Sequence, residues 1–212
     1  MRFLSIMALV LGFLLPSVAQ ANLISNGNFI NCVDCGSGAF VTKNGGSTDI
    51  TNWLVTGHSV DLILSYWQAP PVGGNSVDLS GNNPGGVSQT FATVAGQQYL
   101  VSFYLSGNPD NKGVDTLKEA AVSVGISNQN VAFNTQSFTK TNMGWVLQSF
   151  VFSAIANSST LSFAGSNLDG AYGAAIGGVS VTEAPEPATI MLMAIGLLFM
   201  FGYTALRGRN AA

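Results

Sequence analysis

The clearest strand signal in the chain is Tyr99-Leu100-Val101-Ser102-Phe103-Tyr104-Leu105-Ser106. Every second residue from Tyr99 to Leu105 is large and apolar, and these residues alternate with a smaller or more polar set. Side chains of a β-strand alternate between the two faces of its sheet, so this spacing predicts a strand with one face turned towards a core.

The same two-residue period recurs along the chain, and clusters of Gly, Asn and Pro separate the repeats. No long amphipathic helical pattern competes with it. Many short strands divided by such turns predict an all-β fold, a single sandwich or jelly roll over residues 22–182. The apolar pairs and triplets are Val122, Val124 and Ile126; Phe150 and Phe152; Leu161 and Phe163; and Val179 and Val181, with turn clusters at residues 73–75, 81–85, 107–110 and 165–167.

The N-terminus predicts export. Arg2 precedes an apolar stretch over residues 3–15, and Ala19-Gln20-Ala21 follows with small residues at the two positions that decide cleavage. This pattern is typical of a secretory signal peptide, so we expect residues 1–21 to be removed after Ala21.

The C-terminus predicts a membrane span. Residues 188–206 carry no charge, and nineteen residues of helix extend about 28 Å, close to the thickness of a hydrocarbon core. Arg207 and Arg209 follow, which places residues 207–212 on the cytoplasmic side. Pro185 and Pro187 hold Glu186 on a stiff stalk over residues 183–187, since proline cannot continue a helix upstream.

This tail resembles the PEP-CTERM sorting signal of Gram-negative bacteria. The resemblance rests on Pro185-Glu186-Pro187, the apolar span and the short end bearing Arg207 and Arg209. It implies recognition and processing by an exosortase, and a role for the exported body in exopolysaccharide or biofilm production. The alternative is a plain single-span anchor with a proline-rich stalk.

Charge excludes some partners. Charged residues make up 8% of the chain, against about 25% in ordinary soluble proteins. The predicted body carries four lysines against eight acidic residues, a net charge of −4. No basic face for a nucleic acid and no basic amphipathic segment for a membrane surface is present.

The body resembles the bacterial "choice-of-anchor C" proteins, which are related to a plant cell-wall family long called a domain of unknown function. Its opening residues 22–29 look like the first strand of galactose-binding-like modules. The resemblance implies a galactose-binding-like β-sandwich that associates with cell-wall or extracellular polysaccharide and catalyses no reaction. The segments that carry it further are residues 59–61, 65–68, 76–79, 87–91, 102–103, 105–109 and 143–145.

Two positions depart from that family pattern. The related modules have an acid after the opening Phe and Asp-Asn before the last strand, where this chain has Ile30 and Gly177-Gly178. In such sandwiches these carboxylates help to hold a structural calcium, which requires six to eight oxygen ligands. We therefore expect no metal at this place.

The two cysteines predict a structural disulfide. Cys32 and Cys35 both lie in the exported body, where an oxidised pair is the simplest state, and such a pair would pin the loop after the first strand. A redox role would require the pair to open a helix in a βαβ unit. A zinc site would require about four ligands, and His58 is the only histidine.

Catalysis has little support in the sequence. Asp61 and Asp78 are the best candidates for the two carboxyl groups of a glycosidase, but hydrogen bonding at strand ends or loops is the better explanation of both residues. No serine lies in a Gly-x-Ser-x-Gly elbow. The acidic cluster at Asp110, Asn111, Asp115 and Glu119 does not fit a calcium loop and is read as solvated.

The best candidate for a carbohydrate site is Tyr66-Trp67-Gln68, which enters the proline-rich loop Ala69-Pro70-Pro71. Aromatic rings stack on sugar rings, and an amide binds hydroxyl groups, so this mixture is typical of a binding site. Alternatively, Trp67 plugs the end of the sandwich. Tyr172 is a second candidate platform, and Trp53 and Trp145 are expected in the core.

These observations predict an exported, non-catalytic, carbohydrate-associated module without a cofactor. Its expected partners are an extracellular or cell-wall polysaccharide, an exosortase and the membrane, but no nucleic acid. The alternative is a structural surface or biofilm-matrix protein that binds no specific glycan.

Overall fold

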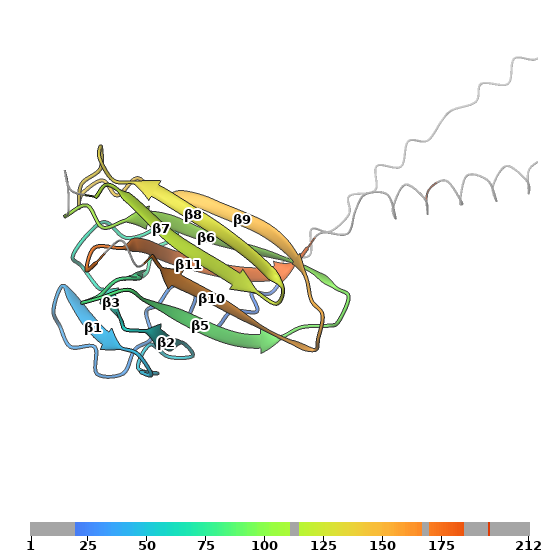
Figure 1. The fold of residues 1–212 in the computed structure, drawn as a ribbon. Coiled ribbons are helices and arrows are strands. Elements are labelled where there is room, and N and C mark those ends of the chain that lie inside the picture. Colours follow the sequence, from blue (N-terminus) through green and yellow to red (C-terminus); the bar gives the residue numbers. More distant parts are fainter. Residues whose placement is uncertain (1–19, 111–114, 167–169, 185–194, 196–212) are drawn as a thin grey trace, which may run out of the picture.

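The computed structural model of the protein describes residues 20–110, 115–166 and 170–184, together with residue 195. Two antiparallel sheets pack against each other (Figure 1), which confirms the predicted all-β sandwich. One sheet has the order β1 (Phe40–Asn44), β3 (Ser59–Ile63), β4 (Ser76–Asp78), β11 (Ala174–Glu183), β6 (Gln98–Gly107) and β9 (Val146–Ser153). The other has the order β2 (Leu54–Gly57), β5 (Gly85–Ala92), β10 (Ser158–Gly165), β7 (Leu117–Val124) and β8 (Ser127–Asn134).

The core lies between the inner faces of the two sheets. Tyr99, Val101, Phe103 and Leu105 of β6 are all buried, as their alternation predicts. Phe103 packs edge-on against Phe163 of β10, with the ring centroids 5.0 Å apart. Phe103 and Phe163 therefore connect the two sheets through direct ring contact, a geometry that aromatic pairs favour.

Ile126 is an exception to the predicted alternation. Its side chain is 72% exposed, whereas Val122 and Val124 are buried. β7 ends at Val124 and β8 begins at Ser127, so Ile126 occupies a two-residue hairpin turn with Gly125, whose φ is 57°. The turn geometry overrides the alternation at this residue.

β11 contains a β-bulge between Gly177 and Ser180. Gly178 has a φ of 58°, and a Cβ atom there would lie 2.5 Å from Cγ2 of Val72. A Cβ atom on Gly177 would clash with Pro70. The glycine pair is thus required by the positive φ and by the loop packed against the bulge.

The opening segment, residues 22–29, does not form the strand expected of it. It lies along β11, and the backbone N–H of Leu23 donates a hydrogen bond to the carbonyl oxygen of Val181 in that strand (2.8 Å). Asn26 and Phe29 both have a φ of 54°, which interrupts extended backbone. The side chain of Asn22 accepts hydrogen bonds from Ile24 and Val181, and these replace part of a strand ladder.

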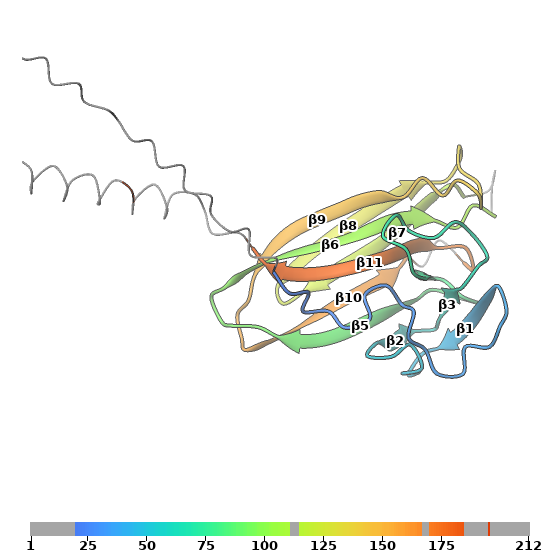
Figure 2. The same ribbon diagram turned by 180° about the vertical axis from the view of Figure 1, so that it is seen from behind.

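The two ends of β11 lie at opposite ends of the sandwich (Figure 2). Its ten residues extend from Ala174 to Glu183, a length of about 33 Å at roughly 3.3 Å per residue. β11 ends at Glu183 at one end of the sandwich, and the site described below lies at the other end, where β11 begins.

The predicted signal peptide and tail lie largely outside the described residues. Pro185, Glu186, Pro187, Arg207 and Arg209 are all outside them, and only residue 195 of the expected span is described. Within the described residues, the structure contains no helix with the length and apolar character needed to cross a membrane.

Candidate functional site

A cleft of about 280 Å³ opens where β11 begins. A larger hollow of about 420 Å³ lies beside the N-terminal segment, but the described residues that line it include no aromatic side chain. The cleft brings together residues that are distant in the sequence. They include aromatic side chains, which can stack, and polar side chains, which can form hydrogen bonds. Its lining includes Phe40, Asp61, Tyr66, Trp67, Asn108 and Tyr172.

The loop between β3 and β4 places Tyr66 at this cleft. The backbone N–H groups of Leu64, Ser65 and Tyr66 all donate to the carbonyl oxygen of Ala39, at 3.0, 2.9 and 3.1 Å. The half-buried Tyr66 ring packs against Phe40 of β1, with centroids 5.1 Å apart and planes at 68°. Two rings from different segments therefore form one wall of the cleft.

Trp67 is a buried residue that only touches the cleft. Its side chain is 6% exposed and packs in a small core with Ile63, Met143 and Ala175. Its indole Nε1–H donates to Oγ of Ser76 at 2.8 Å. This geometry corresponds to the alternative in which Trp67 plugs the end of the sandwich.

Gln68 joins two loops and does not line the cleft. Its Oε1 accepts from the backbone N–H of Met143 (2.9 Å), and its own N–H donates to the carbonyl of Lys140 (2.7 Å). Its carbonyl accepts from Nε1 of Trp145 at 3.0 Å. Gln68 therefore holds the β3–β4 loop against the segment before β9.

A polar network fixes the outer end of Tyr66. Its hydroxyl donates to Oδ2 of Asp110 (2.6 Å) and accepts from Nζ of Lys140 (2.6 Å). Lys140 also pairs with Asp110 at 3.0 Å, and its Nζ lies 3.8 Å from the Tyr66 ring centroid. The hydrogen bond to Tyr66, followed by the Asp110 carboxylate, raises the pKa of Lys140. These contacts hold the Tyr66 ring in one orientation.

The two candidate carboxyl groups, Asp61 and Asp78, are direct cross-strand neighbours on β3 and β4. Asp61 lines the cleft and accepts from Oγ1 of Thr42 at 2.6 Å. Asp78 is fully buried. Its Oδ1 accepts from the N–H groups of Ser80 and Gly173, both at 3.0 Å, and its Oδ2 accepts from Asn108 at 2.8 Å.

Burial raises the pKa of Asp78 to about 7, a rise that the neighbouring Asp61 increases and the donors from Asn108, Ser80 and Gly173 oppose. Burial also raises the pKa of Asp61, against the hydrogen bond from Thr42. Asp78 is inaccessible and both of its oxygens are occupied, so it joins β4 to the loops at Asn108 and Gly173 and does not face a ligand.

The raised pKa of Asp78 predicts a contribution to stability that is present in mild acid and absent at neutral pH. The folded protein keeps the Asp78 proton up to about pH 7, whereas the unfolded chain loses it near pH 4. The stabilisation that comes from the Asp78 proton is complete below about pH 4, the unfolded pKa. It is lost as the pH rises through about 7, the folded pKa. We expect the melting temperature to fall over this window in wild type and to change less in Asp78→Asn; equal slopes would contradict the assignment.

The remaining predicted aromatic residues lie in different surroundings. Tyr172 is 40% exposed and lines the cleft together with Tyr66. Trp53 is buried in the main core, as expected, and donates from Nε1 to the carbonyl of Asn26 (3.1 Å). Trp145 is only partly buried, which corrects the core assignment, because the strand that follows it, β9, lies at the edge of its sheet.

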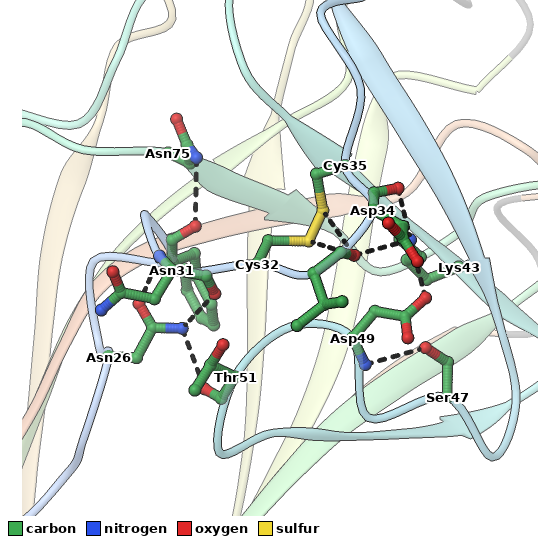
Figure 3. The surroundings of a disulfide bond; sticks show 12 residues. Asn26, Asn31, Cys32, Asp34, Cys35, Lys43, Ser47, Asp49, Thr51 and Asn75 are labelled. Carbon is green, nitrogen blue, oxygen red and sulfur yellow. Dashed lines mark hydrogen bonds and ion pairs between the residues drawn. A yellow bond between two sulfur atoms is a disulfide. The ribbon is translucent and has the colours of Figure 1, made fainter.

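The structure joins Cys32 and Cys35 in a disulfide. Figure 3 shows the bridge beside Lys43, whose Nζ binds Oδ2 of Asp49 at 2.7 Å. The same ammonium group donates to the carbonyls of Val33 and Asp34, at 3.4 and 3.2 Å. The bridge and the lysine together hold the loop that precedes β1.

Among the described residues, no group of three or more His, Cys, Asp or Glu side chains is placed to hold a metal ion. Ile30 is exposed, and His58 is exposed at the crossover from β2 to β3. The absence of calcium at Ile30 and Gly177-Gly178 stays a prediction.

Sequence reasoning missed the partners of Tyr66. Phe40 and Lys140 lie in no motif, and Asp110 lies in a cluster that the sequence predicts to be a solvated loop. Asp110 and Lys140 are 44 and 74 residues from Tyr66 along the chain. A motif within a short stretch of sequence cannot reveal contacts between residues so far apart. The turn cluster at residues 107–110 indicates only that Asp110 lies in a loop.

Comparison with known proteins bears on both parts of the chain. The family model described as "Protein of unknown function (DUF642)" matches residues 22–182, and the "PEP-CTERM protein-sorting motif" matches residues 183–209. Both resemblances seen in the sequence are thereby confirmed. The chain is also 33% identical over 175 residues to Halomucin of Haloquadratum walsbyi, covering 81% of this chain but 2% of that protein.

Solved structures with a similar fold include carbohydrate-binding modules. A family 35 module from Clostridium thermocellum shares 12% identity at a TM-score of 0.45, covering 68% of this chain and 99% of that one. The CBM22-1 xylan-binding domain from Paenibacillus barcinonensis Xyn10C shares 14% at 0.44, covering 69% and 95%. Tailspike protein 4 of bacteriophage CBA120 shares 15% at 0.45, covering 77% and 21%. At these identities the likeness concerns the shape of the sandwich and not its ligand.

Proposed function

Because this chain belongs to the DUF642 family and carries a PEP-CTERM sorting motif, we propose that it is an exported, non-catalytic protein that binds a polysaccharide of the cell envelope or surrounding matrix. The observation that carries the proposal is the cleft in which Tyr66, Tyr172 and Phe40 lie beside hydrogen-bonding side chains. An exosortase would recognise the tail and process it.

The chemistry of the cleft suits a sugar. The C–H faces of a sugar ring are apolar and pack on aromatic rings, while its hydroxyl groups require donors and acceptors at the ring edge. Tyr66 and Tyr172 provide partly exposed rings, and Asp61 and Asn82 provide polar atoms. Tyr66 is fixed by Asp110 and Lys140, so little side-chain entropy is lost on binding.

The charges favour a neutral glycan. Lys140 is the only basic residue near the cleft among those described, and it is paired with Asp110. Asp61 adds a carboxyl group that Thr42 contacts but no described cation neutralises. A polymer rich in uronic acids would therefore meet like charge, whereas a neutral one would meet hydrogen-bond acceptors.

Glycoside hydrolysis is not supported by this geometry. It requires two carboxyl groups that flank the same bond and are both reachable. Asp61 lines the cleft, but its neighbour Asp78 is fully buried with both oxygens occupied by donors.

The position of the cleft suits an exported, tail-sorted protein. It opens where β11 begins, whereas the tail follows the other end of that strand. The cleft therefore lies about 33 Å from Glu183, the end of β11 that the tail follows in the sequence.

The proposal is tested by affinity electrophoresis of the full chain in gels that contain neutral or acidic polysaccharides. We expect Tyr66→Ala and Tyr172→Ala each to weaken binding roughly tenfold, the loss of about 1.4 kcal/mol of ring contact. Tyr104→Ala, a half-buried tyrosine on β6 away from the cleft, is the matched control and should bind as wild type. Equal binding by all three variants would refute the cleft as the site.

A second candidate function is that of a structural matrix protein in which the sandwich serves as a spacer. The observation that favours it is the burial of Trp67, because a buried tryptophan cannot stack on a sugar ring. The cleft is then left with two partly exposed tyrosines, Tyr66 and Tyr172. Failure of wild type to bind any neutral or acidic polysaccharide would favour this function.

A further inference from the structure

The edge strand β9 has an unusual sequence for its position. Its eight residues read Val-Leu-Gln-Ser-Phe-Val-Phe-Ser, without charge, proline or glycine. An exposed sheet edge presents unpaired backbone N–H and C=O groups, and proteins protect such edges with charges, prolines, bulges or very short strands. β9 has none of these protections, and its pairing with β6 is regular over all eight residues.

Two of the other three edges are short: β1 and β2 have only five and four residues, and β1 carries Lys43. β8 is as long as β9 and also lacks charge, proline and glycine, but it is rich in Asn and Gln. The contrast between β8 and β9 is informative, because both are eight-residue edges on the same side of the sandwich (Figure 1).

Both faces of β9 expose apolar side chains. Leu147 and Val151 are 58% and 49% exposed and lie on the outer face of the sheet, opposite Tyr104 and Leu100 of β6. Val146, on the inner face, is 45% exposed. Among the described strands, β9 pairs only with β6, so its other edge is open.

We propose that β9 is an interface at which a second copy of this chain pairs with it in antiparallel fashion and continues the six-stranded sheet. The strand is complementary to itself. With Ser149 opposite Ser149, each Leu147 lies opposite Val151 of the other copy, and both pairs fall on the outer face. No like charges meet because the strand has none, and such apolar cross-strand pairs stabilise a sheet.

This pairing determines how the two copies are oriented. A two-fold axis perpendicular to the sheet reverses the strand direction, so the Glu183 ends of the two β11 strands point in opposite directions. The pairing rests on the sheet edge alone and depends neither on the proposed sorting of the tail nor on glycan binding.

The register is tested by disulfide cross-linking of the full chain in mild detergent. Both natural cysteines are occupied in their own bridge, so Ser149→Cys introduces the only free thiol. We expect Ser149→Cys to give a covalent dimer on mild oxidation and Asn130→Cys, the matched change on β8, to give none. Equal cross-linking of the two variants would overturn the proposal.

Leu147→Lys separates pairing through β9 from association through the tail. Leu147 is largely exposed, so the variant should melt as wild type while placing two charges in the interface. Sedimentation should show dimeric wild type and Asn130→Lys but monomeric Leu147→Lys, and Leu147→Lys should slow cross-linking of Ser149→Cys at least tenfold. A monomeric wild type at its highest soluble concentration, or a dimer that persists in Leu147→Lys, would overturn the proposal.

Discussion

Trp67→Ala is expected to lower the free energy of unfolding by about 3–5 kcal/mol, the usual cost of removing a buried tryptophan. The ring is 6% exposed and is the largest member of the small core with Ile63, Met143 and Ala175. Its loss would also remove the donor to the buried Oγ of Ser76. Urea denaturation followed by intrinsic fluorescence measures the change.

Trp67→Phe is the control for that measurement. Phenylalanine keeps a ring in the core but loses the indole N–H, so we expect a smaller loss of about 1–2 kcal/mol. If Trp67→Ala were as stable as wild type, the ring would not be a structural plug, and its assignment to the core would be wrong.

The predicted instability affects how binding experiments are interpreted. A Trp67→Ala protein that fails to bind a polysaccharide has lost the packing that supports the β3–β4 loop, and Tyr66 is carried by the same loop. Tyr66→Ala and Tyr172→Ala alter partly exposed rings instead. They are therefore the variants that distinguish a ligand contact from a folding defect.

The sequence predicted the long strands well because alternation is a local signal. β6 and β11 each bury the apolar residues that the pattern indicated, and the turn clusters lie between strands. The short strands β2 and β4 show no two-residue period, since three or four residues carry too few repeats. They become strands only through the neighbours with which they pair.

The cleft was predictable in its residue types but not in its geometry. Tyr66, Trp67 and Tyr172 were identified from aromatic chemistry, yet their exposure depends on tertiary packing, which buries Trp67 and leaves Tyr172 open. The pairing of Asp61 with Asp78 depends on the register between β3 and β4. The loop between the two strands sets that register, and alternation within a single strand does not reveal it.

Strand β7 shows a conflict between alternation and residue type. Ala120, Val122 and Val124 face the core, and continuing their period backwards places Lys118 inside, at 0% exposure, next to Gly107 and Thr135. Leu117 is exposed instead. In the part of the chain that the structure describes, Nζ of Lys118 has no hydrogen-bond partner, and Oδ2 of Asp115 lies 3.8 Å away.

Lys118→Met is therefore expected to stabilise the protein by about 1–3 kcal/mol, the cost of a buried donor that has no hydrogen-bond partner. Methionine keeps the stem that packs against Gly107 and removes a buried amino group that, among the described residues, no hydrogen bond compensates. Asp115 loses a distant partner but is partly exposed to water. Thermal melting of the full chain measures the change as a higher melting temperature.

Lys43→Met is the matched control, because it is the same substitution at a second buried lysine. Nζ of Lys43 contacts Oδ2 of Asp49 and two backbone carbonyls, so its removal should destabilise the protein by about 1–3 kcal/mol. Opposite signs at the two sites would show that hydrogen-bond partners, and not burial alone, determine the cost of a buried lysine here. A loss of stability in both variants would mean that Asp115 at 3.8 Å already compensates Lys118.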